Sequence, residues 1–491
     1  MKKLRCRAFL VLAPPLVLLA AAAQAITVTR PVSVQGVTPD SVTIVWNTTE
    51  SVSAVVDYGP TLDYGLSAES KVPSPSHAIT LHNLAPGQTY YYRVRSSDMV
   101  LYAGSDYHFR TVPDKRTSRW RFLAFGDSGK GNATQLSLVP FMVQAQPDFL
   151  IHVGDVIYPA GAAEDFDPKY FVPYAPFVRN TPVWLSIGNH DDATAEAQPY
   201  LDAFYLPRSP AGNERYYSFN YGQAHFVALD SDHMLDPVQL DWLEQDLANA
   251  TTTWKFVYLH HPPYSCGMHG SSTSIRHVVA PLFETYGVDV VFSGHDHDYQ
   301  RSYPMLGEAV VDSAQSPDFK RPRGVIYIVT GGGAGVRPTS AGCPFTAAAI
   351  SVTHFTRVDV DGLTLTLQAI DNQGRVIDTM RIDKSPPLAT PPAGSEPATA
   401  APRLLPSLPN PFNPTTLVRY ELPAPAAVRL AIYDSAGRQV RLLALGEQGA
   451  GVHSIQWDGR DEEGRRTASG LYLVRLQAGD QDRTNKLVLA K

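Results

Sequence analysis

Five short motifs, each placed where a hydrophobic run ends, constrain this chain more than any other feature. They are, in chain order, Gly126-Asp127-Ser128-Gly129, Gly154-Asp155-Val156-Ile157-Tyr158, Gly188-Asn189-His190-Asp191, Val257-Tyr258-Leu259-His260 and Gly294-His295-Asp296-His297. A short apolar run followed by glycine and polar residues is typical of a buried strand that ends in a loop. Because the carboxyl ends of neighbouring strands meet at one edge of a sheet, the motifs predict one shared polar site.

Composition sets the class of protein and excludes one class of partner. The chain has 491 residues, of which 44% are hydrophobic and 18% charged, as expected for a globular protein of about two to four domains. The formal net charge is -6, and the sequence has no long basic run. We therefore expect no nucleic acid as a binding partner, because such binding depends on concentrated positive charge.

The first residues have the features of a secretory signal peptide. A basic start precedes an apolar stretch over residues 9–23, and Ala23-Gln24-Ala25 is a small-x-small cleavage site. A transmembrane anchor is the alternative, but the stretch is short for a membrane span and two prolines interrupt it. We predict that residues 1–25 are a signal peptide and that the protein is secreted or held at the cell surface, with no membrane span.

Cleavage after the signal peptide would leave two cysteines, Cys266 and Cys343. Two cysteines in an exported chain suggest one disulfide. Both lie in glycine-rich segments close to the motifs. We predict a bond between them that joins two loops at the mouth of the site, with two free thiols as the alternative.

Periodicity divides the remaining chain into domains. Residues 26–112 alternate apolar and polar side chains in short runs, which predicts an all-β sandwich. Residues 118–384 alternate strand-like and helix-like stretches, which predicts a layered α/β core. Residues 385–402 are rich in proline, alanine, serine and threonine and are predicted to be an extended linker. Residues 403–491 alternate again and predict a second β-sandwich.

The side chains of the five motifs are of the kinds that bind two metal ions. Carboxylate, phenolate and amide oxygens suit hard ions, and imidazole adds a borderline nitrogen. Two-metal hydrolases hold their ions ~3.5–4 Å apart, so one carboxylate has to bridge them. We assign the bridge to Asp155, because Tyr158 lies three residues on and can reach the same ion. The predicted ligands are Asp127, Asp155, Tyr158 and His297 for the first ion, and Asp155, Asn189, His260 and His295 for the second.

Histidines and aspartates near or outside the motifs need to be separated from the ligands. His261 directly follows His260, so either imidazole can be the ligand, although the Val-x-x-His spacing favours His260. Titratable residues outside the motifs are interpreted as structural, among them His225, His233, His277, His354, Asp57, Asp230 and Asp371.

Charge favours a phosphate ester in such a site. Two carboxylates and one ionised tyrosine carry less negative charge than a trivalent and a divalent ion carry positive charge. The surplus attracts a small phosphorylated substrate and lowers the pKa of bound water. The hydroxide that forms can attack phosphorus in line.

Taken together, the motifs resemble those of the purple acid phosphatases, a branch of the calcineurin-like metallophosphoesterases, over about residues 118–384. Where the wider superfamily has a histidine and an aspartate, this chain has Gly129 and Tyr158, and that exchange is specific to the purple branch. The resemblance implies a four-layer α/β/β/α core, with Fe3+ at the first metal position and divalent iron, zinc or manganese at the second. It also implies that His190 donates a proton to the leaving group or holds the phosphate, and that His269 faces the substrate.

The flanking domains carry resemblances of their own. Residues 26–112 resemble a fibronectin type III domain. Residues 403–491 resemble a FlgD-like immunoglobulin-like domain, on the segments Asn410-Pro411-Phe412-Asn413-Pro414, Trp457-Asp458-Gly459 and Ser469-Gly470-Leu471-Tyr472. Such domains close many exported bacterial proteins and are similar to type IX secretion sorting domains. This resemblance implies anchoring at the cell surface.

Three functions are compatible with these features. The first is a secreted binuclear-metal phosphatase that hydrolyses phosphate monoesters through a metal-bound hydroxide. The second is a phosphodiesterase that uses the same dinuclear site. The third is a surface binding protein with an inactive core, which the complete set of ligand residues disfavours. Asp191 replaces the glutamate of many plant and animal members, and we expect this change to affect a contact behind the ligands rather than a ligand.

Overall fold

The computed structural model describes residues 26–96, 99–386, 401–405, 407 and 410–490. It separates into two compact units, residues 1–386 and residues 387–491. The predicted signal peptide and most of the predicted linker lie outside the described residues. Within the described parts of the chain, no helix is long and apolar enough to cross a membrane.

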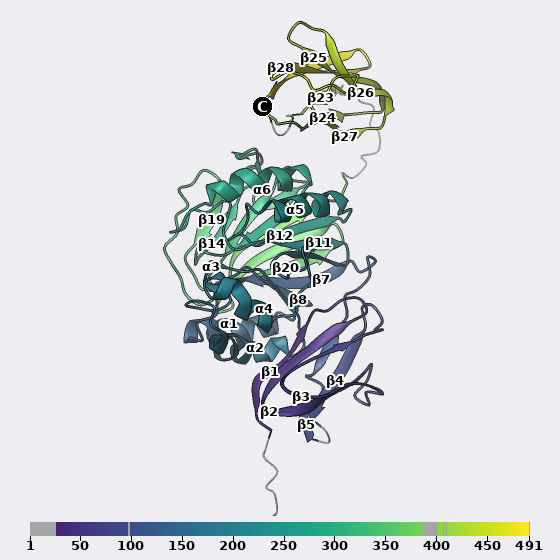
Figure 1. Cartoon of the computed structure of the whole chain (residues 1–491). Helices are drawn as coiled ribbons and strands as arrows, with labels where there is room; N and C mark the ends of the chain where they lie inside the picture. Colours follow the sequence, from purple (N-terminus) through teal and green to yellow (C-terminus); the bar gives the residue numbers. More distant parts are fainter. Residues whose placement is uncertain (1–25, 97–98, 387–400, 406, 408–409, 491) are drawn as a thin grey trace, which may run out of the picture. The chain divides into compact units, whose positions relative to one another are not determined.

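The first unit begins with six antiparallel strands (Figure 1). They are β1 (Val28–Gln35), β2 (Val42–Gly59), β3 (Leu66–Leu81), β4 (Thr89–Ser96), β5 (Met99–Tyr102) and β6 (His108–Arg110). Alternate side chains of β2 and β4, such as Ile44, Trp46 and Tyr92, are buried in the core between the strands. The predicted N-terminal β-sandwich is confirmed.

The rest of the first unit contains two seven-stranded sheets. In spatial order the first sheet consists of β10 (Tyr217–Tyr221), β11 (Ala224–Ala228), β12 (Trp254–Tyr258), β13 (Val290–Ser293), β18 (Ile326–Thr330), β14 (Tyr299–Ser302) and β19 (Thr346–Ile350). The second consists of β17 (Asp318–Lys320), β22 (Val376–Asp383), β21 (Thr364–Asp371), β20 (His354–Asp361), β7 (Arg119–Phe125), β8 (Phe149–His152) and β9 (Val183–Leu185). A short ribbon, β15 (Met305–Leu306) and β16 (Ala309–Val310), forms a separate two-stranded sheet. Strands β7 to β9 are parallel to one another, as are β11, β12, β13 and β18.

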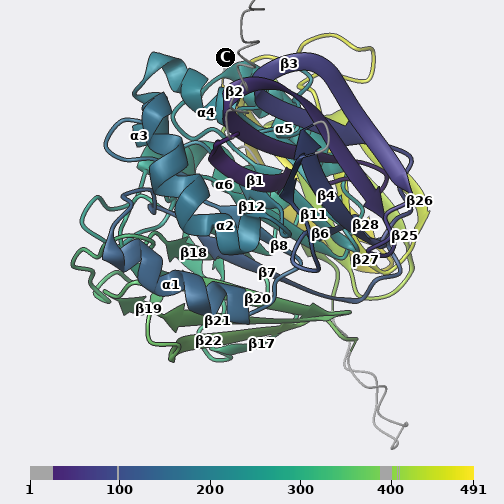
Figure 2. The same ribbon diagram turned by 90° about the horizontal axis from the view of Figure 1, so that it is seen from below.

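Helices cover the outer face of each sheet. They are α1 (Ala133–Gln144), α2 (Val172–Val178), α3 (Asn189–Asp192), α4 (Gln198–Ala203), α5 (Pro237–Asn249) and α6 (Thr273–Thr285), with the short turns η1 (Ala163–Asp165), η2 (Asp167–Phe171) and η3 (Ala195–Ala197). In Figure 1, α5 and α6 lie over β11 and β12, and in Figure 2, α1 lies beside β20 and β21.

The strand residues show why four layers form. In β12 the successive residues Phe256 and Val257 belong to different hydrophobic clusters. Phe256 packs in the cluster between the two sheets, whereas Val257 packs with Leu243 of α5 and Val279 of α6. Because successive strand residues point to opposite faces, a wholly apolar strand is buried on both sides. The predicted α/β/β/α arrangement is confirmed.

The N-terminal strands contact the core away from the five motifs. The Arg30 side chain lies 2.5 Å from the carboxylate of Asp167, and the Tyr92 hydroxyl donates to the backbone oxygen of Arg179. Neither contact includes a predicted ligand. The N-terminal sandwich therefore supports the core without contributing to the predicted site.

The second unit is also made of β-strands. They are β23 (Arg403–Leu404), β24 (Thr416–Leu422), β25 (Ala426–Asp434), β26 (Gln439–Gln448), β27 (Gly451–Trp457), β28 (Gly470–Ala478) and β29 (Gln481–Leu489). They form a three-stranded and a four-stranded sheet. The two sheets share one apolar cluster around Tyr420, Trp457 and Leu476. The prediction of a C-terminal β domain is confirmed.

Candidate metal centre

The structure brings the five motifs together at the carboxyl ends of parallel strands. Asp127 and Asp155 follow β7 and β8, and Asn189 begins α3 soon after β9. His260 and His295 follow β12 and β13 of the other sheet. The site therefore lies where the edges of the two sheets meet, and each motif is carried by a loop anchored on a buried strand.

Backbone geometry at these loops depends on close packing. Asp127, Asp155 and His295 have φ values of 57°, 52° and 67°, in the left-handed region that costs non-glycine residues energy. A side chain at Gly294 would place its first carbon 2.4 Å from the Asp127 carboxylate, and one at Gly188 would place it 2.3 Å from that of Asp155. Glycine at these two positions lets other loops approach the carboxylates closely.

Four of the predicted ligands form one group of donor atoms. The Tyr158 hydroxyl donates to Asp155 Oδ2 at 2.8 Å and to Asp127 Oδ1 at 3.2 Å. His297 Nε2 lies 3.0 Å from the same hydroxyl and 3.4 Å from Asp127 Oδ1. These atoms are the ligand set predicted for the first ion.

The other oxygen of Asp155 lies beside His260 and Asn189, with His295 next to His260. Its Oδ1 lies 3.3 Å from His260 Nε2, which in turn lies 3.1 Å from Asn189 Oδ1. The ring of His295 lies 5.1 Å from that of His260, centre to centre. Asp155 thus directs one oxygen to each group of donors, as a bridging carboxylate must.

The structure distinguishes between the two neighbouring histidines. His260 Nδ1 donates to the backbone oxygen of Val153 at 3.0 Å, which leaves Nε2 unprotonated and directed at the donor group. His261 instead uses Nδ1 to contact the hydroxyl of Ser231 at 2.9 Å. The geometry therefore places His260, not His261, in the group of predicted donor atoms.

Electrostatics also fit a pair of metal ions. Asp127 and Asp155 are both buried, and no lysine or arginine in the described part of the chain forms an ion pair with either. Burial, together with the charge of Asp155, raises the pKa of Asp127 well above its usual range. Burial lowers the pKa of His295 to about 2 and that of His297 to about 4, so both imidazoles are neutral, the form that binds metal.

Tyr158 shows the same need for a cation. Burial, and then the carboxylates of Asp127 and Asp155, raise the pKa of the Tyr158 phenol. Two buried carboxylates and a phenol in contact are unfavourable as anions unless positive charge is supplied among them. A multivalent ion supplies it and favours the phenolate, so the donor set fits the metals.

Comparison with known proteins agrees with this geometry. Residues 121–299 match the calcineurin-like phosphoesterase family, residues 30–111 match the purple acid phosphatase N-terminal domain, and residues 412–482 match the FlgD Ig-like domain. The core therefore carries a calcineurin-like phosphoesterase domain, and the strands before it match the N-terminal domain of purple acid phosphatases. Because the N-terminal match is to that domain, the likeness to fibronectin type III remains a prediction.

Related proteins match more than half of the chain. Acid phosphatase type 7 of Mus musculus is 26% identical over 405 residues, which span 69% of this chain and 87% of that protein. Purple acid phosphatase 15 of Arabidopsis thaliana is 28% identical over 340 residues, 58% of this chain and 61% of that protein. The structure of the purple acid phosphatase PPD1 from yellow lupin (Lupinus luteus) seeds aligns with a TM-score of 0.65 at 21% identity, covering 73% of this chain and 74% of that one. This last likeness shows a shared fold.

Two histidines predicted to face the substrate lie at the rim of this phosphoesterase site. The His190 side chain is 36% exposed, and its Nε2 lies 3.8 Å from Asp155 Oδ2. His269 is exposed, and its ring lies 4.3 Å from that of His295. Both therefore lie close to predicted ligands while remaining open to solvent.

Asp191 supports the ligands from behind, as its place in the third motif suggested. It is buried and accepts hydrogen bonds from the backbone N–H groups of Val156, Ile157 and Gly188, at 2.9 to 3.0 Å. These bonds join the second and third motifs. Asp191 therefore fixes the loop of Asp155 against the loop of Asn189.

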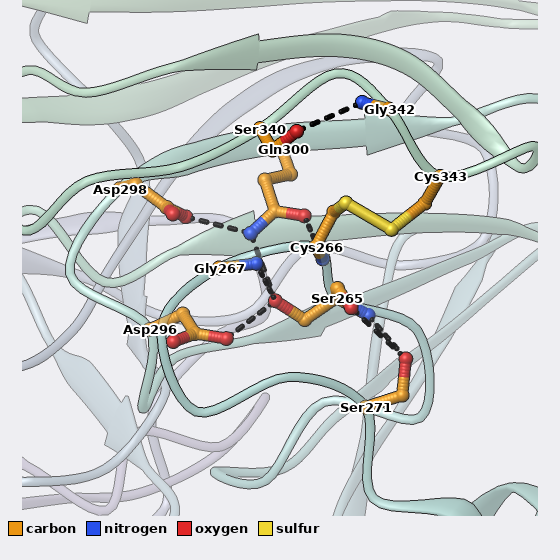
Figure 3. Close-up of a disulfide and its surroundings, with 10 residues drawn as sticks. All are labelled: Ser265, Cys266, Gly267, Ser271, Asp296, Asp298, Gln300, Ser340, Gly342 and Cys343. Atoms are coloured by element: carbon orange, nitrogen blue, oxygen red, sulfur yellow. Dashed lines mark hydrogen bonds between the residues drawn. A yellow bond between two sulfur atoms is a disulfide. The ribbon is translucent and has the colours of Figure 1, made fainter.

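The predicted disulfide between Cys266 and Cys343 is present (Figure 3). Next to it, Ser265 donates to Asp296, and the carboxylate of Asp296 also accepts the backbone N–H of His269 at 2.7 Å. Sequence reasoning missed this role of Asp296, although the residue lies inside the fifth motif. The loop that carries His269 is thus held from two sides, by the disulfide and by Asp296.

Other residues near the site also escaped the sequence analysis. Lys130 directly follows the first motif, and its Nζ lies 4.6 Å from the centre of the Tyr158 ring. Arg337 follows the glycine run at 331–335 and donates its backbone N–H to the backbone oxygen of His297 at 2.9 Å. On the side of His261 lies a cavity of about 580 Å3, whose lining includes Asp232 and His233.

Proposed function

We propose that this chain is a secreted binuclear-metal phosphatase that hydrolyses phosphate monoesters. The observation that carries the proposal is the geometry of Asp155, whose two oxygens serve two separate groups of donors. The names of the related acid phosphatases support the same reaction. Ions held by these groups would activate water and neutralise charge on the phosphate oxygens.

His190 is suited to assist the leaving group. Its Nδ1 contacts the backbone oxygen of Pro159, which can only accept, so Nδ1 carries a proton. The other nitrogen, Nε2, is directed toward Asp155, and in the doubly protonated imidazolium it is the atom that can give a proton to a departing alkoxide. The neighbouring ring of Tyr158, 4.4 Å away centre to centre, limits the orientations of the imidazole.

His269 is proposed to contact the substrate from the other donor group. Its backbone is fixed by Asp296, while its side chain lies beside His295 and is open to solvent. This combination of a fixed backbone and a free imidazole suits a group that holds a phosphate oxygen or a leaving group.

The metals are proposed to be Fe3+ with divalent iron, zinc or manganese. Tyr158 supports Fe3+ in the first group, because a phenolate is a good ligand for a hard trivalent ion. His260 and His295 in the second group suit a borderline divalent ion.

Export and surface display are proposed on separate grounds. Residues 1–25 carry the pattern of a signal peptide, and the disulfide between Cys266 and Cys343 is typical of an oxidising compartment. We propose that the domain from residue 403 onward retains the enzyme at the cell surface. Domain boundaries at 26–112, 118–384, 385–402 and 403–491 are proposed with it.

One assay tests the reaction directly. Purified protein of known metal content is given a chromogenic phosphate monoester and, in parallel, the matching diester. Faster hydrolysis of the monoester, with two metal ions per chain, is the expected result. Faster hydrolysis of the diester would replace the monoester assignment with the phosphodiesterase. Metal-loaded protein that hydrolyses neither compound would leave the inactive surface protein as the better description.

A further inference from the structure

Two cations beside the first donor group have no role in the site described so far. Lys130 lies against the face of the Tyr158 ring. The backbone N–H of Arg337 donates a hydrogen bond to the backbone oxygen of His297. Both side chains are half-buried. One cation therefore accompanies each of two predicted ligands of the first ion, Tyr158 and His297.

Neither cation is paired with a carboxylate. Across the residues that the structure describes, Lys130 and Arg337 form no ion pair, whereas Arg215 and Arg301 of the same domain are each bonded to an aspartate. The Nε of Arg337 is buried without a hydrogen-bond partner in the described structure, and one of its terminal nitrogens contacts only the sulfur of Met268, at 3.8 Å. A buried donor without an acceptor is costly, so Arg337 is set up to receive one.

The two cations belong to one positive patch, which we call the Lys130–Arg337 pair. A side chain at Gly335, two residues before Arg337, would come within 3.4 Å of Lys130 Nζ. Positive charges on neighbouring segments favour the binding of an anion between them. In the proposed function the nearby carboxylates Asp127 and Asp155 would hold the metals, so they would not serve as that anion.

The opposite side of the site has the reverse character. The cavity beside His261 is lined by Asp232 and Asp236 as well as His233. Burial, and then the charge of Asp230, raise the pKa of Asp232 to about 7. Further negative charge is therefore disfavoured in the cavity. An anionic substituent of the substrate would be directed to the Lys130–Arg337 pair instead.

Resting on the proposed function, we propose that the Lys130–Arg337 pair binds a second phosphoryl group of the substrate. The preferred substrates would then carry two phosphates, either joined as a phosphoanhydride or attached to one alcohol backbone. The guanidinium of Arg337 can hold two oxygens of a phosphate at once, and the ammonium of Lys130 adds a point charge.

The reaction needs no further reactant. With a phosphoanhydride, the oxygen of water forms a new bond to one phosphorus, and the bond from that phosphorus to the bridging oxygen breaks. The electron pair stays on the departing phosphate, which takes up a proton. Inorganic pyrophosphate would give two orthophosphates, and a bisphosphorylated alcohol would give orthophosphate and the monophosphate.

Competitive inhibition of monoester hydrolysis separates binding from chemistry. The probes are orthophosphate and methylenediphosphonate, which has two phosphorus groups and cannot be hydrolysed at its bridge. In the wild-type enzyme we expect methylenediphosphonate to bind more tightly by about tenfold or more. Lys130→Gln and Arg337→Gln should each remove most of that advantage. Arg337→Lys should retain part of it, because the charge remains and the fork is lost.

The control is Lys115→Gln, which removes an exposed lysine outside the motifs and should keep the preference of the wild type. Metal content and melting temperature are measured for every variant, so that misfolding is recognised. Equal loss of affinity for both inhibitors in the Lys130 and Arg337 variants would overturn the proposal, because the pair would then hold only the reacting phosphate. Equal affinity of the wild type for both inhibitors would overturn it as well.

Turnover of inorganic pyrophosphate and of a sugar bisphosphate then identifies the source of the second phosphate. Higher kcat/KM for either compound than for the corresponding single-phosphate ester supports the proposal. It also shows whether the preferred substrate is a phosphoanhydride or a bisphosphorylated alcohol. If the wild-type enzyme hydrolyses monoesters and shows no preference for either, this inference fails and the proposed phosphatase stands. If it hydrolyses no phosphate ester at all, the proposed function itself fails.

Discussion

Buried carboxylates are treated in opposite ways in the N-terminal sandwich and at the metal centre. Asp57 of the sandwich accepts hydrogen bonds from Arg93 and Arg95, at 2.7 and 2.8 Å. At the metal centre, Asp127 and Asp155 are more deeply buried and have no lysine or arginine partner among the described residues. Asp57 is thus neutralised by arginines of its own domain, whereas Asp127 and Asp155 leave their negative charge for an ion to neutralise.

The contrast depends on the site rather than on the domain. In the same core, Asp230 is paired with Arg215 and Asp378 with Arg301, each at 2.6 Å. The core therefore has arginines available and uses them away from the metal centre. The absence of such a partner for Asp155 is a specific property of the site.

The largest effect is expected from Asp155→Asn. The variant removes the charge that serves both donor groups, so we expect both ions to be held poorly. Turnover should fall well beyond the ~10–100-fold typical of residues that only support ligands. Metal analysis and monoester hydrolysis of the pure protein provide the measurement. Full activity at normal metal content would show that Asp155 does not bridge the two ions. The contrast with Asp57 would then not hold.

Tyr158→Phe tests the nature of the first ion. If a phenolate binds Fe3+, charge transfer from oxygen to iron colours the protein, and the variant should lose that absorption while keeping the carboxylates that hold the ions. Visible spectra before and after substitution, with iron determined separately, are the measurement. A colourless wild-type enzyme that is active with zinc or manganese would refute the iron assignment alone.

Asp191→Asn should have an intermediate effect. It replaces a carboxylate that accepts three backbone hydrogen bonds by an amide with one accepting oxygen. We expect metal affinity to fall by ~10-fold or more and stability by about 1–3 kcal/mol. Metal titration and denaturant unfolding measure the two effects. Unchanged metal affinity would mean that the loops of Asp155 and Asn189 keep their places without this residue.

Asp57→Asn should have the smallest effect, and only on stability. Loss of charged hydrogen bonds to Arg93 and Arg95 should lower the free energy of unfolding by about 1–2 kcal/mol, with metal content and turnover unchanged. A fall in turnover at full metal content would show that the sandwich influences the site.

The stability that Asp57 contributes should depend on pH, and the same variant can measure this dependence. Burial raises the pKa of Asp57, but the hydrogen bonds from Arg95 and Arg93 outweigh burial, so the pKa lies below its ordinary value. The stabilisation is therefore complete above pH ~4, the ordinary pKa of the unfolded chain. It is lost as the pH falls through the lower pKa of the folded protein. The difference in stability between wild type and variant should vanish there in unfolding curves.

Local sequence patterns were enough to predict much of the fold. The helix over Pro237–Asn249 begins after Asp236, whose side chain caps it, and its apolar side chains recur at helical spacing. The strand that leads to His260 is wholly apolar and is followed by a loop. In each case, the residues that define the element and its end lie close together in the sequence. They can therefore be recognised without knowing the partner surfaces.

Features that depend on distant segments escaped prediction. The strands β20, β21 and β22 complete the second sheet beside β7, more than two hundred residues away in the chain. Lys130 and Arg337 are similarly far apart and become one patch only through folding. No local pattern distinguishes either cation from an ordinary surface residue, because their shared feature is the lack of a partner.

By itself, the sequence determined the order of the strands that carry the five motifs and the kinds of donor atom that follow them. It did so because apolar periodicity and ligand chemistry are both local properties. Only the tertiary structure decided that Asp155 serves two groups and that His260 rather than His261 points inward. It also decided that Lys130 and Arg337 lie beside the site without a carboxylate partner among the described residues. Those outcomes depend on which atoms meet across the two sheets, and packing between distant segments sets such meetings.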